Sequence, residues 1–214
     1  YQYLDMVQVN AGWIGINNSP WMTYYQNNAL NMVTYQGASI NVNPGAGWLL
    51  SGFAINGAQL LGENGFSKQT MYNSTWDNGT ATGNIGTVTS NYTVAIGANW
   101  TSPQEMLNAQ VWGYDFANYA NMLYADTSIK LPVNDDLGFD ISTRVDKLKF
   151  DIEGNEISKY DYSTGKYISG QGEYNIDNSF TLLSSKLGSS YAISDFTNVY
   201  ASVAFANQAP TTSE

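Results

Sequence analysis

Apolar and polar residues alternate along much of this chain, and alternation with a period of two is the pattern of β-strands whose two faces meet different surroundings. In the first sixteen residues, YQYLDMVQVNAGWIGI, the apolar positions Val7, Val9, Ala11 and Trp13 are separated by polar residues or glycine. The segment GTVTSNYTVAIGANW (86–100) repeats the alternation with β-branched residues. Both segments are predicted to be strands.

Further strand-like segments follow, separated by residues that favour turns. The segment GWLLSGFAI (47–55) is apolar at consecutive positions, as expected of a strand that is covered on both faces. In the second half, EGN (153–155) and STG (163–165) are predicted to be turns of a meander, and residues 199–205 alternate again. This pattern predicts an all-β fold in which antiparallel strands pack as one or more β-sandwiches.

One segment has the signals of a helix instead. In TSPQEML, Ser102 suits the N-cap, the proline after it suits the first helical position, and Glu105 completes a capping box. Leu107 and Val111 lie four residues apart, as on one face of a helix. These signals predict at most one short helix, near 103–112.

Charged residues are few and unevenly distributed. They make up 12% of the chain, about half the usual share, and 18 acidic against 8 basic residues give a net charge of −10. Residues 130–214 hold 19 of the charges. This shift suggests three regions: an N-terminal strand (1–16), a region 17–129, and a charged meander region 130–214 in the same domain or a second one. The scarcity of Lys and Arg argues against a nucleic-acid partner.

Several classes of chemistry are excluded by absent residue types. The chain has neither Cys nor His, which removes the usual zinc, haem and thiol-nucleophile sites. We therefore expect no cofactor and no metal. No apolar run is long enough for a membrane helix, so no membrane span is expected. The first residue is Tyr rather than Met, which suggests a processed start and secretion.

Five asparagines stand in the N-x-[ST] pattern of acceptors for N-linked glycans, four of them within residues 71–101. With 24 Asn in the chain, roughly 3 to 4 matches are expected by chance, so only their crowding is informative. The pattern predicts a glycoprotein. The predicted carriers are Asn73, Asn78, Asn91 and Asn99, with Asn17 as a weaker one because Pro20 follows its acceptor pattern.

Acidic residues offer two kinds of candidate site, and neither has a complete motif. A pair of carboxylates would serve a glycosidase or an acid protease, and calcium prefers oxygen ligands. Scattered surface acids are the commoner explanation, so no catalytic and no metal residue is predicted. The candidates are Glu63, Asp77, Glu105 and Asp115 for catalysis, and Asp151, Glu153, Asn155, Asp135, Asp136 and Asp140 for calcium.

All six tryptophans lie in the first half of the chain. Their rings would suit stacking on sugars in a carbohydrate-binding module, although filling a β-core is the stronger interpretation. Abundant aromatic residues with little charge also suit contacts between identical subunits.

The N-terminal strand has no preceding segment with which it would form a hairpin. Either it is an edge strand of its own sheet, or it adds to the sheet of a neighbouring subunit. Repeated strand addition would produce a filament. The predicted donor-strand residues are Tyr3, Leu4, Val7, Val9, Ala11, Trp13 and Ile14.

The processed start at YQYLDMVQVNAGWIGI, the cysteine-free Tyr/Asn/Thr-rich body and the clustered glycan acceptors together resemble the subunits of archaeal surface filaments known as threads. The resemblance implies a non-enzymatic, N-glycosylated structural subunit of an extracellular filament for adhesion or biofilm. Its partners would be identical subunits, with a host surface or neighbouring cells as possible contacts. The alternatives are an acid-active secreted β-sandwich hydrolase and a carbohydrate-binding module.

Overall fold

The computed structural model describes residues 2–3, 6–22, 34–59, 92–118, 120–155, 158–169, 173–194 and 196–207. All regular secondary structure in these ranges is β-strand, so the all-β prediction is confirmed. The same ranges contain no helix with the length and apolarity needed to cross a membrane.

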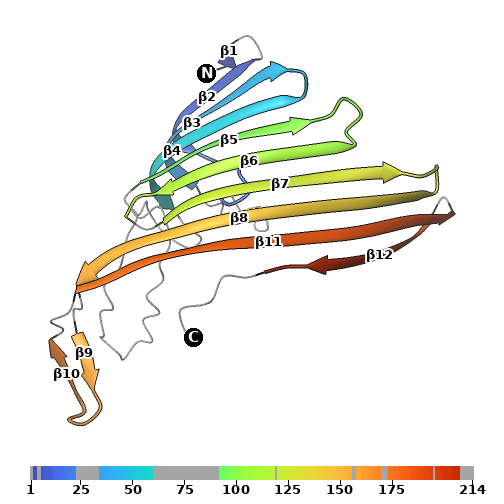
Figure 1. Cartoon of the computed structure of the whole chain (residues 1–214). Helices are drawn as coiled ribbons and strands as arrows, with labels where there is room; N and C mark the ends of the chain where they lie inside the picture. The colour runs from blue at the N-terminus through green and yellow to red at the C-terminus, as the bar shows by residue number, and fades with distance from the viewer. Residues whose placement is uncertain are drawn as a thin grey trace.

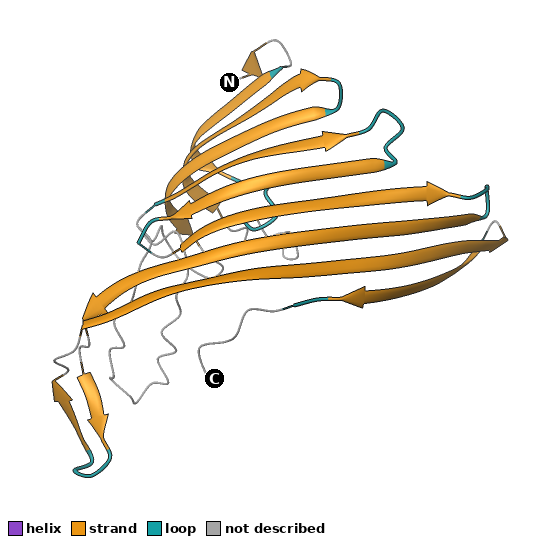
Figure 2. Ribbon diagram, viewed as in Figure 1, coloured by secondary structure: helices purple, strands orange, loops and turns teal. Residues whose placement is uncertain are grey.

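The described residues form twelve strands. These strands are arranged as one large sheet and one small hairpin (Figure 1, Figure 2). The large sheet has ten antiparallel strands in the order β1-β2-β3-β4-β5-β6-β7-β8-β11-β12, and β9 pairs with β10. The strands are β1 Gln2–Tyr3, β2 Val7–Ile14, β3 Thr34–Gly45, β4 Trp48–Gln59, β5 Thr93–Thr101, β6 Leu107–Phe116, β7 Ala120–Pro132, β8 Leu137–Asn155, β9 Ser158–Asp161, β10 Lys166–Ser169, β11 Glu173–Ser194 and β12 Thr197–Phe205.

The cross-strand register assigns each residue of the sheet to one of two faces, because partners in a register point the same way. One row runs from Phe53 through Ala95 and Tyr114 to Met122. Residues 15–22 lie against this face, and we call it the covered face. The opposite face, which includes the Trp48–Trp100 pair, is called the open face.

The buried core lies entirely on the covered face. Side chains from residues 14–22 pack there against strands β3 to β8. Trp112, Tyr114 and Phe116 alternate along β6 and stack, with ring centroids 5.9 Å and 5.8 Å apart. The core consists of Ile14, Ile16, Met22, Tyr35, Phe53, Ile55, Ala58, Ala95, Trp112, Tyr114, Phe116, Ala120, Met122 and Tyr124, with Leu148 and Phe150 packed against it.

The sequence break near 130–138 is a turn within one sheet. Asn134 accepts backbone hydrogen bonds from Asp136 and Leu137 at 2.9 Å and 2.8 Å, which is typical of a tight Asn turn. On either side of it, β7 and β8 pair along their length. The sheet therefore continues across the boundary between the weakly and the strongly charged regions.

The predicted helix near 103–112 is wrong. Its first residues form the turn between β5 and β6, and the rest are in β6. Ser102 does accept a backbone hydrogen bond, but from the Leu107 N–H at 3.0 Å, and Glu105 has a left-handed φ of 56°. Leu107 and Val111 share a face of the strand, because residues four apart coincide in period two as well as in period 3.6.

The two turns predicted in the second half have different outcomes. The turn at 163–165 is confirmed, since it joins β9 and β10. The turn predicted at 153–155 is wrong, because these residues continue β8 and pair with the start of β11. In the described part of the chain no second sheet packs on the open face, so the sandwich arrangement stays unconfirmed.

Gly97 makes room for the largest ring of the core. A Cβ at this position would lie 2.1 Å from the Trp112 ring, which is itself almost fully buried. We expect Gly97→Ala to lower the free energy of unfolding by about 1–3 kcal/mol, because the ring must move within a packed core. Denaturant unfolding followed by tryptophan fluorescence would measure the loss.

Gly113 provides the matched control for this substitution. It lies on the neighbouring strand but on the open face, and a Cβ there would meet nothing within 4 Å. Gly113→Ala should change stability by less than about 0.5 kcal/mol. Equal losses for both variants would contradict the packing of Trp112 on Gly97.

Candidate functional site

The open face of the sheet is apolar. Trp13 and Ile96 on this face are 73% and 70% exposed, and neighbouring strands repeat the pattern. Water-soluble proteins rarely leave so many neighbouring apolar side chains uncovered on one face. The exposed apolar side chains of the open face are Val9, Trp13, Ile40, Trp48, Leu50, Val94, Ile96, Val111, Leu123, Leu131, Phe139, Ile141, Val145, Leu183, Leu187, Tyr191, Val199, Val203 and Phe205.

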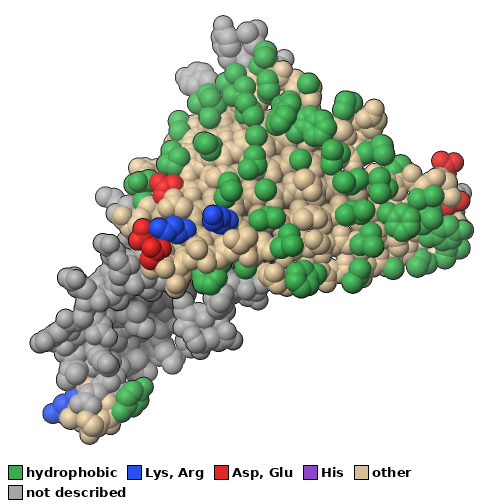
Figure 3. Space-filling view, viewed as in Figure 1, with side chains coloured by type: hydrophobic (Ala, Val, Ile, Leu, Met, Phe, Trp, Pro, Cys, Tyr) green, Lys and Arg blue, Asp and Glu red, His purple; other side chains and the backbone are tan. Residues whose placement is uncertain are grey.

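Apart from acidic side chains at the opposite tip of the sheet, the charges of the open face gather at one end of the strands (Figure 3). Lys149 pairs there with Asp177 at 3.5 Å and with Asp151 at 4.0 Å. Among the side chains that the structure describes, the other charged residues on this face are Asp115 and Lys147, and both lie at the same end. Between its two ends the face is a broad band without charge.

The covered face has the opposite character. Outside the aromatic core it carries mainly hydroxyl, amide and charged side chains, on the side of the sheet where residues 15–22 lie. These polar residues are Gln8, Asn10, Ser39, Asn41, Ser51, Asn99, Thr101, Asn108, Gln110, Asp126, Ser128, Lys130, Asp140, Ser142, Arg144, Asp146, Ser184, Lys186, Ser190, Asn198 and Ser202.

Residues 15–22, which we call the strap, are fixed to the covered face by hydrogen bonds. Asn18 donates to Asn41 at 2.7 Å and to Ser51 at 2.6 Å. Ser19 and Tyr114 share a buried hydrogen bond of 2.8 Å between their hydroxyls. Because buried polar groups are costly unless they are paired, these bonds define one position for the strap.

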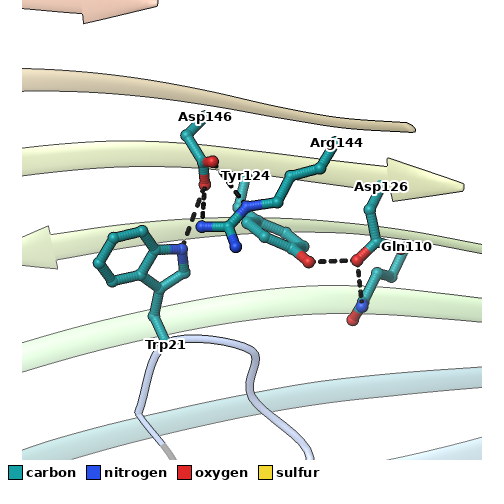
Figure 4. A network of polar contacts seen from close by, with 6 residues as sticks. All are labelled: Trp21, Gln110, Tyr124, Asp126, Arg144 and Asp146. Carbon is teal, nitrogen blue, oxygen red and sulfur yellow. Dashed lines mark hydrogen bonds and ion pairs between the residues drawn. The ribbon is translucent and has the colours of Figure 1, made fainter. Parts of the chain in front are cut away.

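The far end of the strap is held by an ion pair (Figure 4). The Arg144 guanidinium donates to both carboxylate oxygens of Asp146, from Nε at 2.6 Å and from Nη2 at 3.1 Å. The Trp21 indole donates to the same carboxylate at 3.2 Å. The guanidinium also lies 5.4 Å from the Trp21 ring centroid and 5.0 Å from that of Tyr124, within cation–π range. One cation therefore holds a buried carboxylate and two rings.

A second chain of polar contacts starts beside this ion pair (Figure 4). The Tyr124 hydroxyl donates to Asp126, and Gln110 donates to the same carboxylate oxygen at 2.7 Å. The Trp112 indole donates to Gln110 and to Asn99, both at 3.2 Å. In the described residues every fully buried side-chain nitrogen or oxygen has a partner. The covered face is thus an organised polar wall.

The structure places two of the predicted glycan carriers. Asn99 lies in β5 on the covered face, where its side chain accepts the Trp112 hydrogen bond, and Asn17 is exposed in the strap. Asn73, Asn78 and Asn91 lie outside the described residues.

The two candidate catalytic acids that the structure describes do not converge. Glu105 is in the turn before β6 and Asp115 is near the other end of that strand, so ten residues of extended chain separate them by roughly 30 Å. Glu63 and Asp77 lie outside the described residues. The described side chains include no cluster of three or more acids that would hold a metal ion. Of the calcium candidates, Asp135 and Asp136 are exposed in the β7–β8 turn, Asp140 is exposed in β8, Asp151 pairs with Lys149, and Glu153 and Asn155 are in β8.

The residues that organise the covered face were missed at the level of sequence. The signal was present in TRVDKLKF, where Arg144 and Asp146 are two residues apart and so share one face of a strand. Trp21 carries no comparable signal, because it belongs to a loop whose path depends on tertiary contacts.

A single sheet with an apolar face and a polar face is the construction of outer-membrane porins, and this chain shares its fold with part of such proteins. It is similar to OpdK of Pseudomonas aeruginosa, solved with vanillate, with a TM-score of 0.61, 14% identity and coverage of 93% of this chain and 43% of that one. It is similar to OccK2 of the same organism (0.62, 11%, 95% and 46%) and to a BenF-like porin of Pseudomonas fluorescens Pf-5 (0.58, 12%, 97% and 45%).

The chain spans less than half of the length of each of these structures. The sequence matches no known protein-family profile. No curated protein matches it either. At identities of 11% to 14%, the likeness is one of fold.

The interpretation as an archaeal thread-type filament subunit is wrong, because the structural neighbours are porins. Its physical premise fails too: residues 7–14 pair with β3 of the same chain over eight positions, and Tyr3 pairs back onto β2. Leu4 lies outside the described residues. Four further expectations are wrong for the same reason: the homopolymer partner, the extracellular filament location, the absence of a membrane span and the hydrolase alternative.

The Arg144–Asp146 pair should contribute measurably to stability. Asp146 has a side chain only 5% exposed, so Arg144→Met would leave its charge with the Trp21 indole as its remaining described donor. We expect the free energy of unfolding to fall by about 1–3 kcal/mol. Urea unfolding would measure this, and adding Asp146→Leu should recover part of the loss.

Lys149→Met is the control, since both partners of Lys149 are more than half exposed. Pairs of that kind are worth about 0–1 kcal/mol. If Arg144→Met costs no more than Lys149→Met, the ion pair does not hold the covered face together.

Proposed function

We propose that this chain forms part of the wall of an outer-membrane β-barrel channel, with its open face toward lipid and its covered face toward a water-filled lumen. The observation that carries the proposal is the character of the two faces: the apolar face is exposed, and the polar face is the one that carries the strap. Water would penalise this arrangement, whereas a bilayer around an aqueous pore favours it.

The limits of the apolar band support the same orientation. Trp48 and Trp100 lie close together on the open face, with ring centroids 6.3 Å apart, near the short turn that joins β3 and β4. Phe139 lies close to the β7–β8 turn and Tyr191 close to the β11–β12 turn, both at the same end of the sheet. Aromatic side chains favour the boundary between hydrocarbon and water, and charges follow beyond the band at the other end.

A sheet in a membrane must close, because lipid cannot satisfy the hydrogen-bonding groups of an edge strand. The edges of this sheet are β1 and β12, which run antiparallel to one another across ten strands. Since the chain spans less than half of the porins that it resembles, we infer that strands from outside this sheet complete the barrel.

The connections also differ between the two ends of the sheet. At the aromatic end the turns are short, for example 46–47 and 133–136. The opposite end has one short turn, 117–119, and the longer connections 15–33, 60–92 and 156–172. In outer-membrane barrels the short turns face the periplasm and the long loops face outward. Asn73, Asn78 and Asn91, still proposed as glycan carriers, belong to one of the long connections.

In this arrangement the strap narrows the lumen. It crosses the covered face and is held by Arg144 and Asp146 through Trp21. The chain would act by sieving and orienting solutes along its polar wall, which requires neither catalysis nor a cofactor.

The orientation of the faces can be tested with one pair of neighbouring residues. Leu183 and Ser184 are near the middle of β11, the first on the open face and the second on the covered face. Leu183→Arg should cost about 2–4 kcal/mol of folding free energy in lipid vesicles, because the charge enters hydrocarbon. Ser184→Arg should cost less than about 1 kcal/mol. Folding into vesicles from urea gives both values, and equal costs would refute the assignment of the faces.

Channel activity itself is tested by conductance. The purified protein added to a planar bilayer should produce stepwise ionic currents, and Trp21→Ala should raise the conductance of each step because the strap loses its anchor. Trp13→Ala, at an exposed position of the open face, is the control and should leave the step size unchanged. Absence of any step from correctly inserted protein would end the channel proposal.

A further inference from the structure

A groove of about 430 Å³ runs across the covered face between β6 and β12, on the side of the wall away from the aromatic core. Its floor is made by two neighbouring cross-strand rows. One row contains Asn108, Ser128, Ser142 and Lys186, and the next contains Gln110, Asp126, Arg144 and Ser184. Almost every side chain of the floor carries a hydrogen-bonding group.

Three hydroxyl groups in this groove are available to a ligand. Ser128, Ser142 and Ser184 come from three adjacent strands and are half-buried. None of the three hydroxyls has a hydrogen bond to another residue in the part of the chain that the structure describes. They remain reachable by water, so a ligand hydroxyl can replace that water without leaving a buried group unpaired.

The charges around these hydroxyls are balanced and already engaged. Arg144 is bound to Asp146, and Asp126 accepts from Tyr124 and Gln110. Lys186 lies 5.4 Å above the Tyr200 ring, on the side away from β8. Arg144 and Lys186 stand against Asp126 in the groove and Asp146 beside it, so these four charges cancel and give little attraction for an ion.

We propose that this groove binds small neutral polyols, with the three serine hydroxyls exchanging hydrogen bonds with successive hydroxyls of the ligand. The inference rests on the proposed function only in requiring that the covered face borders the aqueous lumen. An open-chain polyol is uncharged, and each of its carbons carries a hydroxyl that can donate and accept a hydrogen bond. The serine side chains also stand at regular intervals, because they come from adjacent strands of one sheet.

Three six-carbon probes that differ at one terminal group test the proposal: D-sorbitol, its carboxylate analogue D-gluconate and its amine analogue D-glucamine. Ligand-observed NMR on the full chain folded in detergent micelles gives the dissociation constant of each. Sorbitol should bind more tightly than either charged analogue. The triple variant Ser128→Ala, Ser142→Ala and Ser184→Ala should weaken sorbitol binding at least tenfold, because three hydrogen bonds are lost.

The matched control removes three hydroxyls from the open face of β11 that do not line the groove, by Ser179→Ala, Thr181→Val and Ser189→Ala, and should leave sorbitol binding unchanged. No sorbitol binding, equal binding by the two triple variants, or tighter binding of gluconate or glucamine would overturn the proposal. Ionic conductance is measured separately: a conducting protein that does not bind sorbitol refutes the groove alone, and a protein that binds sorbitol without conducting refutes the channel alone.

Discussion

The continuous antiparallel ladder is the constraint on which the other properties of this chain depend. Once neighbouring strands are in register, each residue is committed to one face and the next residue to the other. Arg144 faces the polar wall and Val145 the apolar band for this reason alone. A slip of one residue in any strand would exchange the two surroundings over its whole length, so the contrast between the faces itself specifies the register.

The covered face combines two kinds of packing that rarely share a surface. At one end, large rings fill space against the strap, and Gly97 leaves the volume that Trp112 occupies. Beside them, carboxylates are held by the donors of Arg144 and Gln110. The rings exclude water from Asp146, and the ion pair in turn fixes Trp21. Apolar burial and charge pairing therefore support each other here.

Much of the secondary structure could be predicted from the sequence, because alternation is a local property. Strands at 7–14 and 93–101 follow directly from it. The helix error at Leu107 and Val111 came from residues four apart, a spacing that both periods satisfy. Alternation cannot reveal whether the apolar face of a strand packs against protein or is exposed to lipid. Trp48 and Leu50 would look the same facing a second sheet or facing lipid, and this ambiguity led to the filament interpretation.

The β8–β11 ladder joins nineteen residue pairs, whereas β2 and β3 share eight. Nineteen residues of strand extend roughly 60 Å, and at a tilt of about 45° they still rise roughly 40 Å, well above the apolar band of about 25 Å in an outer-membrane barrel. If the sheet is embedded as proposed, the rim of the barrel is uneven. On the side of β8 and β11 it would overhang the headgroups, and the carboxylates and ammonium groups that end these strands would stand in the surrounding water.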